Sequence, residues 1–269
     1  MKLSIIVTNY KNSQLLKECL DSIKKYCRVE NYEIIVSDSA TEEDMKLMMR
    51  ENFPEVIFFP FRKNTGFAKL VNKGLKTAKG EYLLVMNGDI IMLENSISKL
   101  LDYICHHPET GIVGPQLLNF NGTSQSSCFR FYKPMTIVYR RTFLGKMKFA
   151  QNHLAKFLMK DADLKSIKEV DWLMGSALMT SRAAVDKVGY LDTRYKMYLE
   201  DTDWCRRFWS NGYKVIYYPE AKMYHYHGKG SAGKNVVGSL LFNKLTWWHI
   251  ASAVKYFRKY LGQPLPKHN

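Results

Sequence analysis

The stretch EYLLVMNGDI, residues 81–90, holds the feature that decides the fold. Its apolar run from Tyr82 to Met86 predicts a buried strand, which stops at Asn87, Gly88 and Asp89. In an extended segment residues two positions apart point the same way, so the oxygens of Asn87 and Asp89 can face one cation. A hard divalent ion takes such oxygens together with substrate phosphate oxygens. Asn-Gly is also a common turn dipeptide, so an ordinary turn remains the alternative.

Strands and helices alternate on both sides of this stretch. Strands are expected at 3–8, 32–37, 56–59, 81–86 and 112–117, and helices at 13–26, from 41 onward, at 66–78 and at 94–106. After a looser region, a helix is expected from 200 to 211, followed by a strand. Continuous apolar strands separated by helices predict an α/β fold, with a mostly parallel sheet covered by helices on both faces.

Polar residues follow the first two expected strands as well. Thr8, Asn9 and Tyr10 come after the first strand, and Asp38 comes after the second. Ligands of such sheets bind at the carboxyl ends of the strands, so we expect these residues near Asp89. The carboxylate at Asp38 can accept hydrogen bonds from a ribose or a base, or it can cap a helix.

The segment KNTGFAKLVNKG, residues 63–74, opens the third expected helix. It contains Asn64 and Asn72, and it can cradle phosphate or ribose at a helix N-terminus. Because it lacks the G-x-G-x-x-G spacing, it does not predict a dinucleotide fingerprint.

Two further clusters can carry chemistry. Glu200, Asp201 and Asp203 fall at an expected helix start, where the helix dipole stabilises carboxylates. They can cap that helix, or one of them can act as a general base near an acceptor hydroxyl. His225 and His227 lie on one side of an expected strand and can bind a metal or a phosphate. A single structurally satisfied histidine is the alternative there.

The net charge of +15 is unevenly distributed. Residues 110–160 and residues 221–269 each contain eight Lys or Arg and no Asp or Glu, and the rest of the chain is close to neutral. Such segments favour an anionic partner, namely phosphate, nucleic acid or lipid headgroups, over a merely solvated surface.

Composition narrows the class of protein further. The 269 residues, 46% of them hydrophobic, suffice for one large domain or two small ones. We expect no membrane-spanning helix and no signal peptide. The five cysteines form no C-x-x-C pair, so we expect reduced thiols in a cytoplasmic protein.

Several of these segments together resemble a known family. The quoted pieces are SIIVTNY, EIIVSDSAT, NTGFAKLVNKGLKTAKGEYLLVMNGDI and a block from VDWLMGSALM through YLEDTDWCRRFWSNGYKVIYYP. They resemble the inverting glycosyltransferases of family 2, with the GT-A fold, over about residues 2–120 and 169–231. The rhamnosyltransferase-like enzymes of polysaccharide assembly are the most similar subgroup.

The resemblance implies roles for individual residues. The nucleotide would be held by Thr8, Asn9, Tyr10, Asp38, Asn64 and Asn72. Asp89 would bind Mg²⁺ or Mn²⁺ as the carboxylate of a D-x-D element whose first position is here Asn87. Asp201 would be the catalytic base, with Glu200 as the alternative. One of His225 and His227 would lie near the metal and the diphosphate.

The resemblance also implies the organisation and the reaction. Residues 1–231 would form the catalytic domain: a nucleotide-sugar half (1–118), a variable basic and aromatic segment (119–168), and an acceptor and base half (169–231). The reaction would move a sugar from a nucleotide-diphosphate donor to a hydroxyl of a glycan or a polyprenyl-diphosphate-linked acceptor. A nucleotidyltransferase lacks support because residues 8–16 contain no glycine, and a nucleic-acid-binding protein lacks a recognised motif.

Residues 232–269 are expected to form a basic, partly helical C-terminal tail. Trp247, Ile250, Val254, Phe257 and Leu261 recur at steps of three and four residues and make one apolar helix face. With the basic residues of 128–160, this face predicts peripheral binding to an anionic membrane surface on the cytoplasmic side. A helix packed on the catalytic domain is the alternative.

Overall fold

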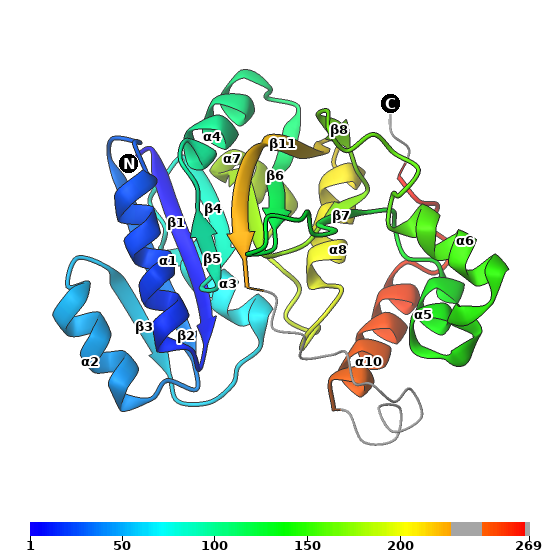
Figure 1. The fold of residues 1–269 in the computed structure, drawn as a ribbon, viewed down its shortest axis with the longest axis horizontal. Helices are drawn as coiled ribbons and strands as arrows, with labels where there is room; N and C mark the ends of the chain where they lie inside the picture. The colour runs from blue at the N-terminus through cyan, green and yellow to red at the C-terminus, as the bar shows by residue number, and fades with distance from the viewer. Residues whose placement is uncertain (227–243, 267–269) are drawn as a thin grey trace.

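The computed structural model describes residues 1–226 and 244–266. His227 and the expected boundary between residues 231 and 232 lie outside the described residues. Figure 1 shows a central sheet with helices on both of its faces. The expected α/β class is therefore confirmed.

Within residues 1–226 and 244–266, the main sheet contains nine strands, most of them parallel. Its order is β3-β2-β1-β4-β10-β6-β11-β5, and β8 pairs with β11. The strands are β1 (Leu3–Tyr10), β2 (Tyr32–Ser39), β3 (Ile57–Phe61), β4 (Tyr82–Asn87), β5 (Ile90–Met92), β6 (Thr110–Leu118), β8 (Lys168–Glu169), β10 (Ala177–Ser181) and β11 (Lys214–His225). A second, two-stranded sheet joins β7 (Cys128–Phe129) to β9 (Trp172–Leu173).

Alternation along the central strands divides the core between the two faces. Ile5 and Val7 of β1 pack in one core, whereas Ile6 packs in the other. Because both faces are buried, the strand is apolar along its whole length, as the sequence indicated. The helices are α1 (Ser13–Tyr26), α2 (Glu43–Asn52), α3 (Phe67–Thr77), α4 (Ser96–His106), α5 (Pro134–Arg141), η1 (Phe143–Lys146), α6 (Lys148–Phe157), α7 (Arg182–Val188), α8 (Glu200–Ser210) and α10 (Lys244–Lys259).

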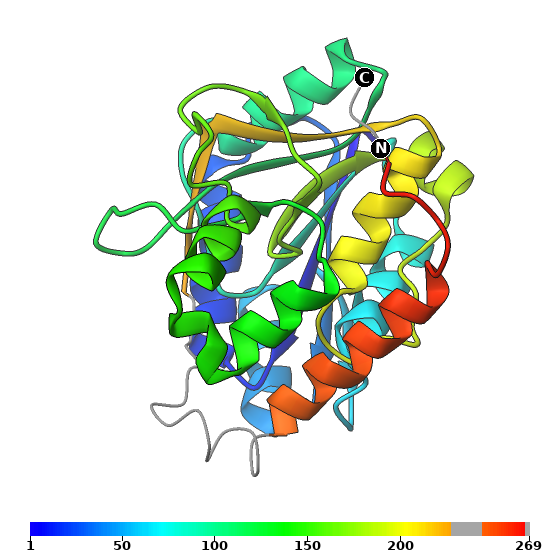
Figure 2. The ribbon, with the colours of Figure 1, turned by 90° about the vertical axis from the view of Figure 1, so that its right-hand side faces the viewer.

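Two features were not expected from the sequence. Strand β10 runs antiparallel between β4 and β6, in the middle of an otherwise parallel region. Residues 134–157 form α5, η1 and α6. Their sequence gives a weak helical signal, because α5 contains β-branched residues and buries only Thr136. Packing of α5 against α6 and α10 stabilises it instead. Figures 1 and 2 show α5 next to α6 and α10, on the side of the molecule away from α2.

Helix α10 packs on the preceding part of the chain through a mostly polar face. Its buried residues are Thr246, His249, Ser252, Ala253 and Tyr256. The predicted apolar face points mostly outward: Trp247 is 56% exposed, Val254 52%, and Leu261 just beyond the helix 83%. The helix thus packs on the domain and also presents apolar side chains to solvent. Among the described residues, no helix is both long and apolar enough to cross a membrane.

One buried carboxylate joins α10 to α8. Asp203 is inaccessible to solvent and accepts hydrogen bonds from Lys259 Nζ at 2.6 Å and Tyr260 OH at 2.9 Å. Arg207 Nε, at 3.0 Å, and Tyr195 OH, at 3.2 Å, donate to the same carboxylate. Since the charge is fully paired, its burial is tolerated, and the C-terminal helix is held against α8.

Substitution of Asp203 tests this connection. Asp203→Ala leaves Lys259 without its buried partner, so we expect a loss of about 3 kcal/mol or more in the free energy of unfolding. Lys46→Ala is the control, because it removes the exposed pair of Lys46 and Glu43 and should cost less than about 1 kcal/mol. Urea unfolding followed by circular dichroism measures both. Equal stabilities of the two variants would contradict the role of Asp203.

Candidate functional site

A cavity of about 930 Å³ opens at the carboxyl ends of β1 and β4. Thr8 of β1 lies opposite Asn87 of β4 in the parallel register, which brings the polar ends of the two strands together. Of the residues expected from the sequence, the cavity is lined by Thr8, Asn9, Tyr10, Asn64, Asn87 and Asp89. Later parts of the chain complete the wall with Lys196, Met197, Tyr226, Leu245 and Trp248.

Asp38 lies behind this wall. It is inaccessible to solvent, and its Oδ1 accepts a hydrogen bond from Asn9 Nδ2 at 2.7 Å. Its Oδ2 is buried without a hydrogen-bond partner among the described residues. Burial raises the pKa of Asp38, opposed by hydrogen bonds from Thr41 and Asn9. Asp38 therefore orients Asn9, which itself lines the cavity.

The two predicted asparagines of the α3 region lie in different places. Asn64 lines the cavity and accepts a hydrogen bond from the backbone N–H of Gly66 at 3.0 Å. Asn72 does not line the cavity. Its amide donates to Leu191 O at 2.8 Å and accepts from Leu191 N at 3.0 Å. Both ends of the Asn72 amide are thus engaged in holding the chain at Leu191 against α3.

Two glycines are required where the cavity wall is tightest. A Cβ on Gly88 would lie 2.9 Å from Asn9 Oδ1, so a larger residue at position 88 would push against Asn9, which lines the cavity. Gly66 has φ +86°, and a Cβ there would lie 2.8 Å from the carbonyl oxygen of Lys196. Larger residues would push apart the loops that form the wall.

Asp89 and His225 form the centre that best fits a metal ion. His225 Nε2 lies 3.5 Å from Asp89 Oδ1, and that oxygen is buried without a hydrogen-bond partner among the described residues. On its other side His225 Nδ1 pairs with Gln125 Oε1 at 2.9 Å, which fixes the ring. Burial raises the pKa of Asp89 to about 6. A cation would relieve this burial cost, so the residues fit a divalent ion.

The described side chains at this centre are too few to fill the coordination positions of a metal ion. No cluster of three His, Cys, Asp or Glu side chains able to hold a metal occurs within residues 1–226 and 244–266. Asn87 lies beside it, but its Oδ1 accepts from Thr8 Oγ1 at 3.3 Å and its Nδ2 donates to Ser176 Oγ at 3.4 Å. The remaining positions would therefore be filled by substrate phosphate oxygens or water, as hard divalent ions allow.

The acidic cluster of α8 lies next to the cavity. Asp201 accepts hydrogen bonds from the backbone N–H of Gly175 at 3.0 Å and of Thr202 at 2.8 Å. Gly175 lies between Asp201 and the cavity wall. A Cβ built on this glycine would touch Cβ of Asp201 and also the ring of Phe67, which lines the cavity. Asp201 is partly exposed, so it is placed to receive a proton from a molecule next to Phe67.

Glu200 and Asp201 differ in the protonation that their surroundings favour. Glu200 is buried, and its Oε2 has no hydrogen-bond partner among the described residues. Burial, and then the charge of Asp201, raise the pKa of Glu200 to about 8. Burial also raises the pKa of Asp201, but its backbone hydrogen bonds favour the charged form. The surroundings thus favour the neutral form of Glu200, whereas at Asp201 the hydrogen bonds from Gly175 and Thr202 oppose the effect of burial on the pKa.

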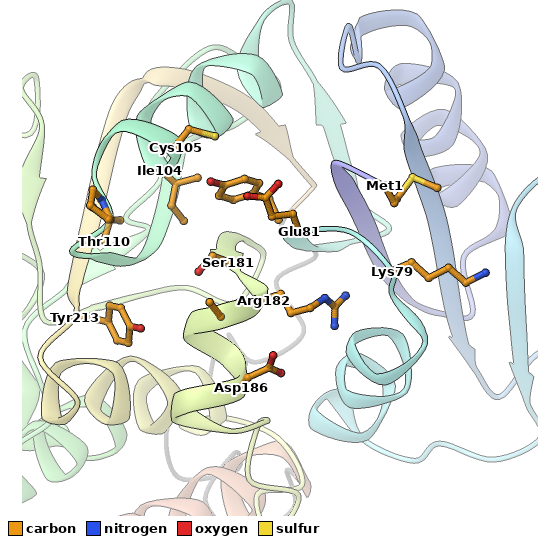
Figure 3. Close-up of a pocket in the computed structure, with 13 residues that line it drawn as sticks. Met1, Lys79, Glu81, Ile104, Cys105, Thr110, Ser181, Arg182, Asp186 and Tyr213 are labelled. Atoms are coloured by element: carbon orange, nitrogen blue, oxygen red, sulfur yellow. The ribbon is translucent and has the colours of Figure 1, made fainter.

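A second cavity, of about 610 Å³, lies at the opposite edge of the sheet. Figure 3 shows its wall, which includes Met1, Glu81 and Thr110 at the amino ends of strands. Arg182 there already donates to the carbonyls of Gly80 and Ala78. None of the predicted functional residues lines this cavity.

Several residues of the site gave no usable signal in the sequence. Gln125 lies in a polar turn and only the fold brings it to His225. Lys196 and Met197 lie in an irregular segment, and Leu245 and Trp248 belong to the C-terminal helix. Their contribution depends on contacts between distant parts of the chain.

Comparisons with known proteins agree with this geometry. A model of the family described as "Glycosyl transferase family 2" matches residues 4–164. The N-acetylglucosaminyl-diphospho-decaprenol L-rhamnosyltransferase of Mycobacterium tuberculosis is 26% identical over 221 residues, which cover 77% of this chain and 70% of the relative. The rhamnosyltransferase WbbL of Escherichia coli is 24% identical over 260 residues, covering 95% of this chain and 92% of the relative.

Solved structures support the fold. The mannosyltransferase PcManGT from Pyrobaculum calidifontis, in complex with GDP-Man and Mn²⁺, aligns with a TM-score of 0.58 and 16% identity, over 98% of this chain and 76% of that one. The expected GT-A fold is therefore confirmed, and the named relatives agree with the expected rhamnosyltransferase-like subgroup. Since the family model matches more than half of the chain, the protein belongs to glycosyl transferase family 2 and is a glycosyltransferase.

Proposed function

We propose that the protein transfers a sugar, with inversion, from a nucleotide-diphosphate sugar to a hydroxyl of a glycan or polyprenyl-diphosphate-linked acceptor in the synthesis of a cell-surface polysaccharide. The observation that carries this proposal is one cavity with two different carboxylates beside it. Asp89 has an unpartnered buried oxygen facing His225, and Asp201 has backbone hydrogen bonds that favour its charged form. The first suits the diphosphate end of the donor, and the second suits the acceptor.

In the proposed reaction the acceptor oxygen attacks the anomeric carbon from the side opposite the diphosphate. Its proton passes to Asp201, the new glycosidic bond forms, and the bond to the diphosphate oxygen breaks. Asp89 and His225 would hold Mg²⁺ or Mn²⁺, which supplies positive charge beside the leaving diphosphate when bound. Asn9, oriented by Asp38, and Asn64 lie where the nucleotide would be held. Attack opposite the leaving group inverts the configuration.

The relatives support the class of donor and acceptor. One is named for a decaprenyl-diphosphate-linked acceptor, and a solved neighbour was crystallised with GDP-Man and Mn²⁺. These names support the proposal of a cation-held diphosphate at Asp89 and an acceptor hydroxyl at Asp201.

We further propose that the enzyme acts as a peripheral protein on an anionic membrane surface at the cytoplasmic face. Helix α5 contacts η1, α6 and α10. Exposed apolar side chains lie along the segment from η1 to α6 and on α10: Phe143 (71% exposed), Met147 (46%), Phe149 (53%), Trp247 (56%) and Val254 (52%). Lys146 and Lys148 lie among them. Apolar side chains with lysines between them suit the boundary of anionic headgroups and acyl chains.

Removal of the metal ligand tests the donor site. Asp89→Ala should abolish the Mn²⁺-dependent binding of a nucleoside diphosphate, because the cation loses its charged ligand. Calorimetry with the diphosphate, in Mn²⁺ and in chelator, measures this. The control is Glu94→Ala, which removes an exposed carboxylate five residues away and should bind like the unaltered protein. Unchanged affinity in the Asp89 variant would refute the assignment.

The two neighbouring carboxyls can be separated by isosteric substitutions. Asp201→Asn removes the proton acceptor, so we expect kcat to fall by about 10²-fold or more with donor affinity retained. Glu200→Gln imitates the neutral acid that burial favours, so most activity should remain. The roles of the two residues would be exchanged if Glu200→Gln lost the rate and Asp201→Asn kept it.

Vesicle co-sedimentation tests the membrane surface. Phe143→Ser combined with Phe149→Ser should reduce binding to phosphatidylglycerol-containing vesicles, because less apolar area enters the bilayer boundary. Lys146→Gln with Lys148→Gln should weaken it by about 1 kcal/mol per charge. Leu47→Ser, at a 45% exposed site on α2, is the control and should bind normally. Equal binding of the unaltered protein to neutral and anionic vesicles would contradict the proposal.

A further inference from the structure

Two adjacent arginines at the end of α5 lack an acidic partner. Arg140 and Arg141 form no ion pair with any carboxylate within the described residues. The remaining residues, 227–243 and 267–269, contain no Asp or Glu. No side-chain carboxylate of this chain thus neutralises the pair, although Arg141 is partly buried. An unneutralised, desolvated guanidinium costs free energy, which a bound anion would recover.

The guanidinium groups are held in place by neutral partners. Arg141 Nε donates to His249 Nδ1 at 2.9 Å, and Arg140 Nη1 donates to Tyr132 OH. Arg140 also lies over the rings of Tyr132 and Phe157. Burial, followed by the charges of the two arginines, lowers the pKa of His249 to about 3, so this histidine stays a neutral acceptor. The remaining N–H groups of both arginines are available to an anion.

The position of the arginine pair relates it to the base. His249 packs edge-on against Tyr198, with ring centres 5.0 Å apart, and Tyr198 precedes Glu200 by two residues. Tyr132 lies near Asp201, because the charge of Asp201 contributes to raising the pKa of Tyr132. Neither arginine lines the donor cavity. The pair therefore lies outside that cavity, and its partners His249 and Tyr132 connect it to the region of Asp201.

The location at the end of a helix does not by itself explain the pair. Basic residues in the last turn of α5 do interact favourably with the helix dipole. That interaction is available to fully solvated side chains and requires no buried histidine as a partner. The cluster instead places the forked donors of arginine in a fixed geometry that matches phosphate oxygens.

We propose that Arg140 and Arg141 bind the diphosphate of a lipid-linked acceptor and so position its sugar hydroxyl at Asp201. This inference rests on the proposed function and names the recognition element for its acceptor. Phe143 on η1, Phe149 on α6 and Trp247 on α10 are exposed, and all three of these elements contact α5, which carries the pair. The prenyl chain, which stays attached to the diphosphate, would extend over these side chains into the membrane.

Binding can be tested without turnover. Farnesyl diphosphate is titrated into the full-length protein in chelator, so that the metal-dependent donor site does not take the diphosphate. We expect binding that weakens about tenfold or more in Arg141→Gln and in Arg140→Gln, since each loses a charge-assisted hydrogen bond. Arg141→Lys should recover part of the loss. Lys156→Gln is the control, because it removes an exposed charge from the neighbouring helix α6 and should leave this affinity unchanged.

Two further measurements separate the sources of phosphate and the two proposals. Vesicle binding by Arg141→Gln should be normal; if it falls while farnesyl diphosphate still binds, the pair contacts lipid headgroups and the inference is wrong. Nucleoside diphosphate binding with Mn²⁺ should be retained in both arginine variants, which also shows that they fold. Unchanged farnesyl diphosphate affinity in both variants would overturn the inference even if the donor-site and base substitutions behave as proposed.

Discussion

The buried carboxylate of Asp203 is the interaction on which the arrangement of the site depends. It lies two residues after Asp201 on α8 and is held by Lys259 and Tyr260 from the C-terminal helix and its end. The same helix fixes the segment before α8, because Ser252 donates to Met197 O at 2.9 Å and Lys255 donates to Arg194 O at 2.8 Å. The position of Asp201, the proposed base, is thus determined by residues more than fifty positions away in the chain.

The donor side depends on a different constraint, namely the parallel register of β1 and β4. This register places Thr8 opposite Asn87, and the chain then turns so that Asp89 meets His225 at the end of β11. Strand β5 makes the meeting possible, since it follows Asp89 directly and runs antiparallel to β11. The proposed metal ligands and most of the proposed nucleotide-binding residues therefore come from strand ends, whereas the residues proposed for the acceptor come from loops and later helices. This division is expected for a rigid sheet with variable connections.

The sequence predicted the parts of the fold that have a clear period or boundary. The bounds of α1, α3 and α8 and most strands of the first half were obtained to within a few residues. Residues 134–157 were not recognised as helical, because β-branched and aromatic residues hide the helical pattern. Contacts of α5 with α10 stabilise the helix instead. Strand β10 gave no sign of its direction, because an apolar strand buried on both faces looks the same in either orientation. In the candidate site, strand-end residues such as Asp89 were identifiable, whereas Gln125 and Trp248 depend on long-range contacts.

The burial of Glu200 has a consequence for the whole chain. Its pKa lies near 8 in the folded protein, well above the ordinary value of 4.5. Between these two values the folded state binds a proton that the unfolded state has released. Glu200 therefore contributes stability that is complete below about pH 4.5 and is lost as the pH rises through 8. Folding takes up a proton in this range. The neutral carboxyl beside Asp201 therefore makes the enzyme's free energy of unfolding fall as the pH rises.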